Sequence, residues 1–171
     1  MTAVLTSPGL EYEQSYGAYI VELSDEERYP FPLDLPHKDF PALLSRLNDF
    51  AKGVNIPEGF VPSSTYWLVE HGELLGVSNL RHHLNDRIRN SGGHIGLGIR
   101  PSYRGRGLGH LLMALTIQEA RRKGIGEIYL HCHKNNEAST RMIISNGGVL
   151  ESELKGVEAA DTVQRYVVAV T

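Results

Sequence analysis

The sequence predicts one domain of mixed α/β class, on the basis of three observations. The chain has 171 residues and 41% of them are hydrophobic, which suits a single sizeable core. Apolar patterns typical of strands alternate along the chain with patterns typical of helices. A glycine-rich segment also joins a strand pattern to a strongly apolar helical pattern. We therefore expect a single domain over residues 1–171.

The first half of the chain is expected to hold three strands and two helices. A short strand at residues 2–6 is followed by a helical pattern at residues 10–23. A second helical pattern at residues 40–51 lies within a proline-rich stretch, which favours fixed irregular connections. Two strands within residues 65–83 are expected to turn near His71.

The second half begins with a strand at residues 94–100, directly before the glycine-rich segment. Leu108, Leu111, Leu112 and Leu115 then follow the spacing of one helix face. The rest of this helix is also largely apolar, so we expect it to lie buried on a sheet. The remaining elements are a strand at residues 127–133, a short helix at about residues 137–146, and two closing strands at residues 149–154 and 162–170.

The glycine-rich segment RPSYRGRGLGHLL, residues 100–112, is expected to hold phosphate. Its glycines let the main chain approach an oxygen without a Cβ in the way. The amides and the positive dipole end at the start of the following helix favour an anion, and two arginines add charge. The residues concerned are Arg104, Gly105, Arg106, Gly107 and Gly109.

Two common phosphate-binding motifs are excluded by spacing. A Walker A loop requires a lysine followed by serine or threonine, and the chain contains no such pair. A dinucleotide fingerprint requires a third glycine, which is replaced by His110 in one register and by Leu112 in the other. The strand expected to end near a ribose, residues 130–134, also lacks an acidic residue. The ligand is therefore expected to be neither ATP of the Walker type nor a dinucleotide.

The remaining pattern, Arg104-x-x-Gly107-x-Gly109, resembles the GNAT superfamily of N-acetyltransferases. In that family an R/Q-x-x-G-x-G/A pattern lies between the fourth strand and the third helix and binds the pyrophosphate of acetyl-CoA. The segment NNEASTRMIISNGG, residues 135–148, is similar to the family's segment after the fifth strand. Together these motifs cover about residues 65–150, and they resemble a bacterial subgroup described only as predicted acetyltransferases.

The resemblance implies a GNAT-like fold with acetyl-CoA as co-substrate and no metal. This fold has a central, mostly antiparallel sheet of about seven strands, a parallel and splayed pair formed by strands 4 and 5, and about four helices. The pantetheine arm would lie along the fourth strand. The residues implied for cofactor binding are Leu97, Ile99, Arg100, Arg104, Gly105, Arg106, Gly107, Leu108, Gly109, His110, Asn136 and Ser139.

Catalysis would then need an oxyanion donor and a base. The resemblance implies a backbone amide near Ile99 as the donor. His94 is the first candidate base, because it opens the fourth strand and an unperturbed imidazole titrates near neutral pH. The equally supported alternative is that His94 is only a polar residue at the start of a strand, and His82 is a second candidate base. The family's usual general acid, a tyrosine, is replaced by Ile143 or Ile144, so we assign no acid.

Other side chains have a structural interpretation that competes with a chemical one. His131 and His133 project to the same face of a strand, as a metal pair would, but no third ligand has suitable spacing. Cys132 is better explained by packing than by chemistry. Arg165 and Tyr166 belong either to the core or to the mouth of an acceptor site, and both readings stay open.

Charge is unevenly placed along the chain. The net charge of −3 argues against general nucleic-acid binding. Residues 11–34 contain seven acidic side chains and one basic side chain, whereas residues 81–106 contain six arginines opposed only by Asp86. This basic segment surrounds the glycines, which favours a small anionic ligand. An ordinary solvated surface is the alternative.

Composition also bears on the compartment. The N-terminal sequence lacks the pattern of a signal peptide, and the longest apolar runs have five residues, too few to cross a bilayer. The single cysteine cannot form an internal disulfide. We therefore expect a cytoplasmic protein without a membrane partner.

The sequence thus predicts an acetyl-CoA-dependent N-acetyltransferase that acts on a primary amine by direct attack in a ternary complex. The acceptor is expected to be a small molecule or a peptide and not a nucleic acid, and its site is expected to be built from residues 30–63 and 81–93. A non-catalytic CoA-binding sensor or regulator is the alternative, favoured by the missing tyrosine. Nucleic-acid binding is a third reading, and a homodimer stays open.

Overall fold

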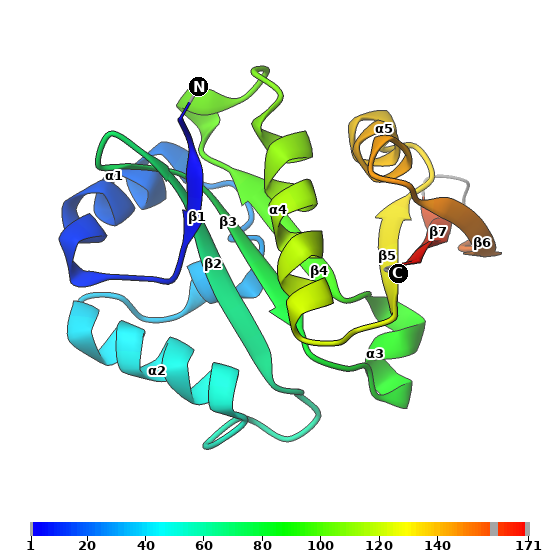
Figure 1. The fold of residues 1–171 in the computed structure, drawn as a ribbon, viewed down its shortest axis with the longest axis horizontal. Helices are drawn as coiled ribbons and strands as arrows, with labels where there is room; N and C mark the ends of the chain where they lie inside the picture. The colour runs from blue at the N-terminus through cyan, green and yellow to red at the C-terminus, as the bar shows by residue number, and fades with distance from the viewer. Residues whose placement is uncertain (1, 158–160, 170–171) are drawn as a thin grey trace.

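The computed structural model describes residues 2–157 and 161–169. In these residues seven strands form two antiparallel sheets, with the orders β1-β2-β3-β4 and β5-β7-β6 (Figure 1). The predicted closing strand reached Val170, which lies outside the described residues. The strands are β1 (Val4–Thr6), β2 (Ser63–Glu70), β3 (Glu73–Arg81), β4 (Ile95–Ile99), β5 (Glu127–His133), β6 (Val149–Leu154) and β7 (Val163–Ala169).

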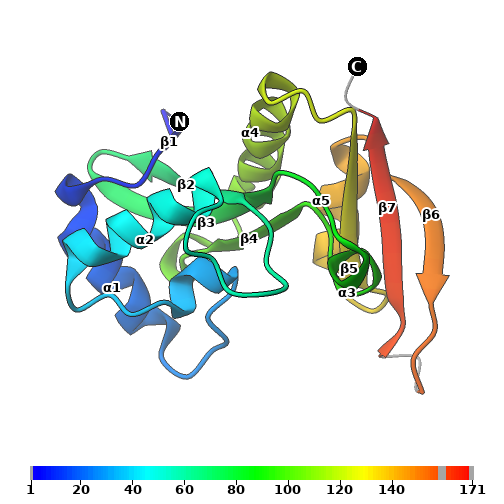
Figure 2. The same cartoon turned by 90° about the horizontal axis from the view of Figure 1, so that it is seen from below.

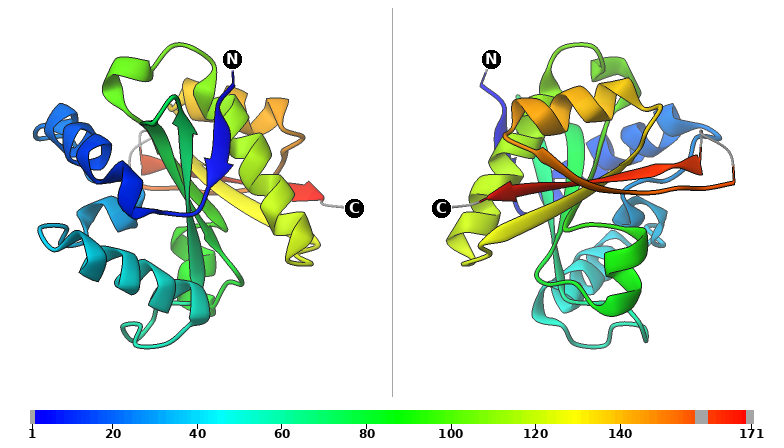
Figure 3. Two further views of the ribbon diagram at one scale, coloured as in Figure 1. Left: turned by 60° about the vertical axis from the view of Figure 1, so that its left-hand side comes forward. Right: turned by 90° about the vertical axis from the view of Figure 1, so that its right-hand side faces the viewer.

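Five α-helices pack around the sheets in the described residues. Helices α1 (Glu13–Leu23) and α2 (Phe40–Lys52) cover one face of the first sheet, and α4 (Leu108–Arg122) covers the other (Figures 1 and 3). Helix α5 (Glu137–Ser145) lies on the second sheet, and α3 (Asp86–Ser91) connects β3 to β4. None of the described helices combines the length and the hydropathy that a membrane span requires.

Helix α2 is anchored by its caps and its buried face. Asp39 accepts a hydrogen bond from the Ala42 amide at 3.1 Å, which satisfies one of the free donors at the helix start. Gly53 ends the helix in the left-handed conformation, with φ 71°. The prediction of a helix at residues 40–51 is therefore confirmed to within one residue.

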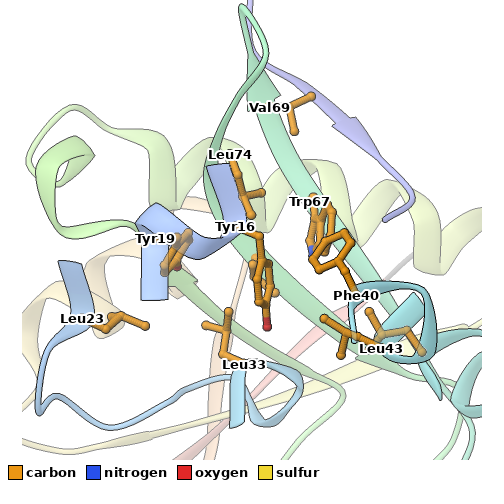
Figure 4. Packing of buried hydrophobic residues seen from close by; sticks show 11 residues of the cluster. Tyr16, Tyr19, Leu23, Leu33, Phe40, Leu43, Trp67, Val69 and Leu74 are labelled. Atoms are coloured by element: carbon orange, nitrogen blue, oxygen red, sulfur yellow. The ribbon is translucent and has the colours of Figure 1, made fainter. Parts of the chain in front are cut away.

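An aromatic cluster fixes α1 and α2 on the first sheet (Figure 4). Trp67 of β2 is buried between Tyr16 of α1 and Phe40 of α2, with ring centroids 5.5 and 6.1 Å from the indole. Such pairs each add about 0.5–1.5 kcal/mol to the stability given by their buried area. The cluster therefore holds both ends of the long connection between the two helices.

Helix α4 joins the two sheets through one buried surface. Leu112, near its start, packs with apolar residues of β2 and β3, whereas Ile117, near its end, packs with Ile128 of β5. All three side chains are at most 5% exposed. The predicted burial of this helix on a sheet is confirmed, and α4 is the element that sets the position of one sheet relative to the other.

The two sheets meet at β4 and β5, which run in the same direction and diverge (Figures 1 and 2). The His94 amide, directly before β4, donates a 2.7 Å hydrogen bond to the Tyr129 carbonyl of β5. No ladder pairs the two strands in the described residues. The predicted GNAT-like fold with a splayed pair of strands 4 and 5 is confirmed.

One helix was not predicted. Helix α3 lies within residues 81–93, for which no helix was expected. It is capped by Asn85, whose side chain accepts a hydrogen bond from the Ile88 amide at 2.8 Å. The helix has six residues, and Ile88 is its one apolar residue, so the sequence carries no periodic apolar signal. This helix accounts for the difference between the expected four helices and the five observed.

Candidate active site

Two cavities lie along β4, one at its first residues and one at its last. The first, of about 700 Å³, is lined by the glycine-rich loop and one edge of β4, and we call it the loop cavity. The second, of about 1070 Å³, is lined by His94, His131 and His133, and we call it the histidine cavity. Four residues line both cavities, so the two spaces adjoin there: Glu26, Glu27, Tyr29 and Ser139.

The loop cavity ends at the start of α4, where none of the described side chains caps the helix. Gly105 and Gly107 have φ values of 78° and 76°, which non-glycine residues rarely adopt, and no atom lies within 4 Å of where their Cβ atoms would be. Gly107 is the N-cap of α4, and the Leu111 amide makes the first bond of this helix, to the Gly107 carbonyl. The three amides before Leu111 therefore have no helical acceptor. Such amides and the helix dipole fit the phosphates of a CoA ester.

The predicted loop residues divide into two groups. Arg104, Gly105, Gly107, Leu108, Gly109 and His110 line the loop cavity. Arg106 does not, and its guanidinium lies 5.2 Å from the ring centroid of Tyr103 instead. The Arg104 side chain bridges two parts of the site, because its Nε donates to the Ile99 carbonyl at 3.0 Å and its Nη1 lies 3.0 Å from a Glu26 carboxylate oxygen.

Arg100 does not fit its predicted contact with the cofactor. The residue is 8% exposed and does not line the loop cavity. Its guanidinium forms ion pairs with Glu22 and Glu73, and its amide donates to the Leu75 carbonyl of β3 at 2.8 Å. The Arg100 carbonyl accepts a hydrogen bond from the Tyr103 amide at 2.9 Å, so neither backbone group of Arg100 is free at the open edge of β4. The structure assigns Arg100 to the packing of α1 on β3 and β4.

The open edge of β4 has the backbone donors that the family resemblance implied. Backbone N–H groups of successive residues in a strand point to opposite edges. Because the Arg100 amide points to β3, the amides of Leu97 and Ile99 point to the other edge, toward β5. On the face of β4 away from α4, a Cβ on Gly96 would lie 2.7 Å from the Tyr29 hydroxyl oxygen. The absence of a side chain at Gly96 therefore allows Tyr29 to lie against the strand where the two cavities adjoin.

Asn136 and Ser139 are placed by the start of α5. The Asn136 side chain accepts a hydrogen bond from the Ser139 amide at 3.1 Å, so Asn136 is the N-cap of α5. Asn136 lines the histidine cavity and not the loop cavity. Ser139 lines both, so of the two predicted cofactor residues it is the one that the loop cavity contains.

The geometry of His94 argues against its predicted role as base. The side chain is 6% exposed, and its Nδ1 accepts a 2.9 Å hydrogen bond from the Tyr129 amide. Nδ1 is therefore occupied as an acceptor, and Nε2 carries the proton of the neutral ring. Burial, together with the charges of Arg165 and Arg81, lowers the pKa of His94 to about 4. At neutral pH the ring therefore has no free acceptor nitrogen with which to take a proton from the substrate.

The other candidates for proton transfer are placed elsewhere. His82 forms a 2.8 Å hydrogen bond with the Ser64 hydroxyl, and it lines neither cavity. Ile143 is buried and Ile144 is 54% exposed, and neither lines a cavity. Tyr103 lines the loop cavity beside the glycines.

The two histidines of β5, His131 and His133, differ in their burial. His133 is exposed, whereas both ring nitrogens of His131 are buried and have no hydrogen-bond partner. Burial and the charges of Arg165 and Arg81 lower the pKa of His131 to about 4. Among the described residues no three histidine, cysteine or acidic side chains gather as metal ligands would. Cys132 contacts the Thr140 hydroxyl at 3.6 Å and lines the histidine cavity.

The two oppositely charged segments of the sequence pair with each other across the site. Glu22 of α1 binds Arg100, and Glu26 binds Arg104. Glu22 also accepts a hydrogen bond from the Ser102 amide at 2.8 Å. Despite the opposing effect of burial, the bonds from Ser102 and Arg100 lower the pKa of Glu22. Two of the six arginines in residues 81–106 are therefore paired with acidic side chains inside the fold.

Several cavity residues were missed at the sequence level. Glu27 and Tyr29 lie in the connection between α1 and α2, directly before the proline-rich stretch. Phe31, Phe50 and Phe60 form a packed aromatic wall of the histidine cavity, with ring centroids 5.1–5.9 Å apart. The proline-rich composition was the available signal for this wall, but it did not specify which side chains face the cavity.

Comparison with solved structures gives the same fold at low identity. An acetyltransferase of Salmonella typhimurium, YncA, solved with its cofactor acetyl-CoA, is 16% identical with a TM-score of 0.66; the match covers 100% of this chain and 95% of that one. An S. typhimurium acetyltransferase that modifies the N-terminal serine of ribosomal protein L7/L12 is 18% identical with a TM-score of 0.68, over 100% and 96% of the two chains. A Vibrio cholerae spermidine N-acetyltransferase variant, SpeG, is 16% identical with a TM-score of 0.64, over 98% and 95%.

The family is established by sequence. No curated protein matches the chain significantly. The model of the acetyltransferase (GNAT) family matches residues 20–145, which run from the last turn of α1 to the end of α5 and include the glycine-rich loop. The match confirms the predicted family and enzyme class. The chain therefore belongs to the GNAT family of acetyltransferases, with acetyl-CoA as its co-substrate.

Proposed function

We propose that the protein transfers an acetyl group from acetyl-CoA to a primary amine by direct attack in a ternary complex. The observation that carries the proposal is the junction of the two cavities beside β4. A donor in the loop cavity and an acceptor in the histidine cavity would meet at Glu27 and Tyr29. Direct transfer needs both substrates at one point and no covalent enzyme intermediate.

The donor is held mainly by main-chain groups. The amides at the start of α4 would bind the diphosphate, and the amides of Leu97 and Ile99 would bind the pantetheine arm as an additional strand does. An amide at this edge also stabilises the oxyanion that forms on the acetyl carbonyl, and the loss of one such donor typically costs about 3 kcal/mol in the barrier. Arg104 orients the glycine-rich loop through its bonds to Ile99 and Glu26.

Glu27 replaces His94 as our candidate for the base. Its side chain is exposed, lines both cavities and has no hydrogen bond or ion pair among the described residues. A carboxylate at the junction can take a proton from the acceptor ammonium, directly or through one water. His94, by contrast, has its one acceptor nitrogen occupied by the Tyr129 amide.

In the proposed reaction the neutral amine nitrogen forms a bond to the thioester carbon, the carbon–sulfur bond breaks, and the nitrogen releases one proton to solvent as the amide forms. CoA leaves as a thiolate, which takes a proton from solvent, because a thiol with a pKa near 8.5 is an acceptable leaving group. We assign no protein acid. An acyl-enzyme route would need Cys132, the chain's single cysteine, and we expect Cys132→Ala to retain turnover.

The proposal is tested by following free CoA thiol with purified protein and a panel of amines. The solved structures with this fold include enzymes for a ribosomal protein N-terminus and for spermidine, so the panel includes a peptide and a polyamine. Thiol release with an acetylated amine of the correct mass supports the transferase.

The second candidate is a CoA-binding sensor, which the isoleucines at positions 143 and 144 favour, since no tyrosine is present there to protonate the thiolate. Calorimetric binding of CoA without thiol release from any amine would favour the sensor. Release of thiol that depends on an amine would exclude it.

A further inference from the structure

Arg81, at the end of β3, is a half-buried cation without an acidic partner. Its Nη1 donates a 2.8 Å hydrogen bond to the Gly93 carbonyl, and the residue lines the histidine cavity. No carboxylate in the described residues lies within ion-pair distance of its guanidinium, and burial lowers its pKa. A desolvated guanidinium that is not paired costs free energy, which a bound anion would recover.

The other arginines around β4 and β5 are paired differently. Arg100 binds Glu22 and Glu73, Arg104 binds Glu26, and Arg165 lies 3.4 Å from a Glu151 carboxylate oxygen. Arg81 lines the histidine cavity and, unlike these three arginines, has no carboxylate partner in the described residues. The position suits an anionic group of a ligand.

His131 provides a second, independent observation in the same cavity. Both of its ring nitrogens are buried without a hydrogen-bond partner, although most buried polar atoms in proteins have one. His131 and Arg81 line the same cavity, and burial together with the charges of Arg165 and Arg81 lowers the pKa of His131 to about 4. At neutral pH the ring is uncharged and carries one N–H donor. A carboxylate beside Arg81 would give this donor an acceptor.

We propose that Arg81 and His131 form a subsite for a carboxylate of the acceptor, so that the substrate is an amine that also carries a carboxylate. The inference depends on the proposed transferase function and specifies its substrate class. The planar guanidinium of Arg81 offers donors in the geometry of a carboxylate, and His131 adds a neutral donor. The acceptor amine would then extend toward Glu27 at the junction.

The aromatic wall defines the rest of the acceptor. Phe31 and Phe60 line the histidine cavity and pack against the buried Phe50. Phe60 is 44% exposed, so part of an apolar surface faces the cavity. An apolar side chain would cover this surface and gain from its burial. The subsite and the wall together point to a free amino acid with an apolar side chain, such as phenylalanine or leucine, and against a peptide N-terminus, which has no adjacent carboxylate.

Binding tests the subsite without any turnover. Calorimetry compares N-acetylphenylalanine and N-acetylleucine with their uncharged amides, on the full chain. We expect each acid to bind at least about tenfold more tightly than its amide, since a factor of ten corresponds to about 1.4 kcal/mol. Arg81→Met should remove this preference, and His131→Phe should reduce it. Equal affinity of acid and amide on the wild-type protein would overturn the proposal.

Arg46→Met is the matched control. Arg46 also lines the histidine cavity, but its guanidinium already donates to the Asn55 carbonyl and lies 4.6 Å from the Phe50 ring centroid. This variant should keep the ratio of acid to amide affinity. Loss of the ratio in both variants would show general electrostatics and would overturn the specific role of Arg81. Acetyl-CoA affinity, measured on each variant, verifies that the fold is intact.

Turnover separates this proposal from the proposed function. Thiol release is followed with phenylalanine, phenylalanine amide and phenethylamine. These amines share the aromatic side chain and carry a carboxylate, an uncharged amide or no such group, respectively. A higher kcat/KM for the acid, lost in Arg81→Met, supports both proposals. Faster release with the amide or with phenethylamine retains the transferase and overturns the subsite. Acid-selective binding with no release from any amine supports the subsite and contradicts the transferase.

Discussion

The two cavities of this acetyltransferase recognise their ligands with different parts of the chain. The loop cavity is built from main-chain amides, glycines and arginines whose charges are already paired inside the protein. The histidine cavity is built from side chains that come from distant segments. In the described residues it holds a cation without a carboxylate partner, Arg81, and an imidazole without a hydrogen-bond partner, His131. A backbone site depends on spacing, whereas a side-chain site depends on which residues the fold brings together.

The largest expected effect tests the backbone site. Gly107→Glu places a carboxylate where the diphosphate is expected, at a position with φ 76°. We expect acetyl-CoA affinity to fall at least ~1000-fold, about 4 kcal/mol, as measured by calorimetry. Gly107→Ala is the control, because its Cβ would meet open space and only the positive φ would cost ~1 kcal/mol of stability. Unchanged affinity in the glutamate variant would show that the diphosphate binds elsewhere.

The next effect concerns the charges paired within the fold. Arg100→Met leaves Glu22 and Glu73 without their partner, so we expect the free energy of unfolding to fall by ~3 kcal/mol in urea titrations. Acetyl-CoA affinity of the folded variant should stay within about twofold of the wild type, because Arg100 does not line the loop cavity. A twofold change corresponds to less than about 0.5 kcal/mol. A large loss of acetyl-CoA affinity with little loss of stability would instead show that Arg100 contacts the cofactor.

The junction of the cavities is tested through Glu27. Glu27→Gln should lower kcat ~100-fold, an effect in the usual range for loss of a general base, and should leave the affinity for acetyl-CoA unchanged. Asp34→Asn removes another carboxylate that lines the histidine cavity but not the junction, and it should retain turnover. If both variants are as active as the wild type, a different group takes the proton.

The smallest effect tests the neutral state of His94. Its pKa is about 4 in the fold and about 6.5 in an unfolded chain, so the unfolded state binds more protons between these values. The contribution of His94 is therefore present above pH 6.5 and is lost as the pH falls, by ~2 kcal/mol at pH 5. Unfolding free energies of the wild type and His94→Gln, compared from pH 7.5 to 5, should converge as the pH falls. Parallel curves would mean that His94 titrates normally.

Local sequence was a reliable guide wherever spacing alone decides the geometry. The pattern from Arg104 to Gly109 lies at the start of a buried helix, as its glycines and the following leucines indicated. Asn136 caps α5 because the cap is formed within four residues. Both features depend on backbone conformation and on contacts between near neighbours, which a single sequence reveals.

The misassigned residues share a different cause. Arg100 follows a strand and precedes the glycines, so by position it suits the cofactor, but Glu22 and Glu73 come to it from α1 and β3. His94 suits a base by residue type, but the Tyr129 amide of β5 occupies its acceptor nitrogen. In both cases the deciding partner is more than 25 residues away in the chain, and no local pattern indicates it.

The sequence by itself determined the strands, four of the five described helices and the glycine turn before α4, because these follow from periodicity and from short-range backbone geometry. The family was indicated by the resemblance of its motifs. Tertiary structure alone decided that Glu27 and Tyr29 stand between the two cavities, that α4 sets one sheet against the other, and that Arg81 faces a cavity without a carboxylate. Charge and hydrogen-bond capacity belong to a residue, but whether they are satisfied depends on what the folded chain brings within a few ångströms of it.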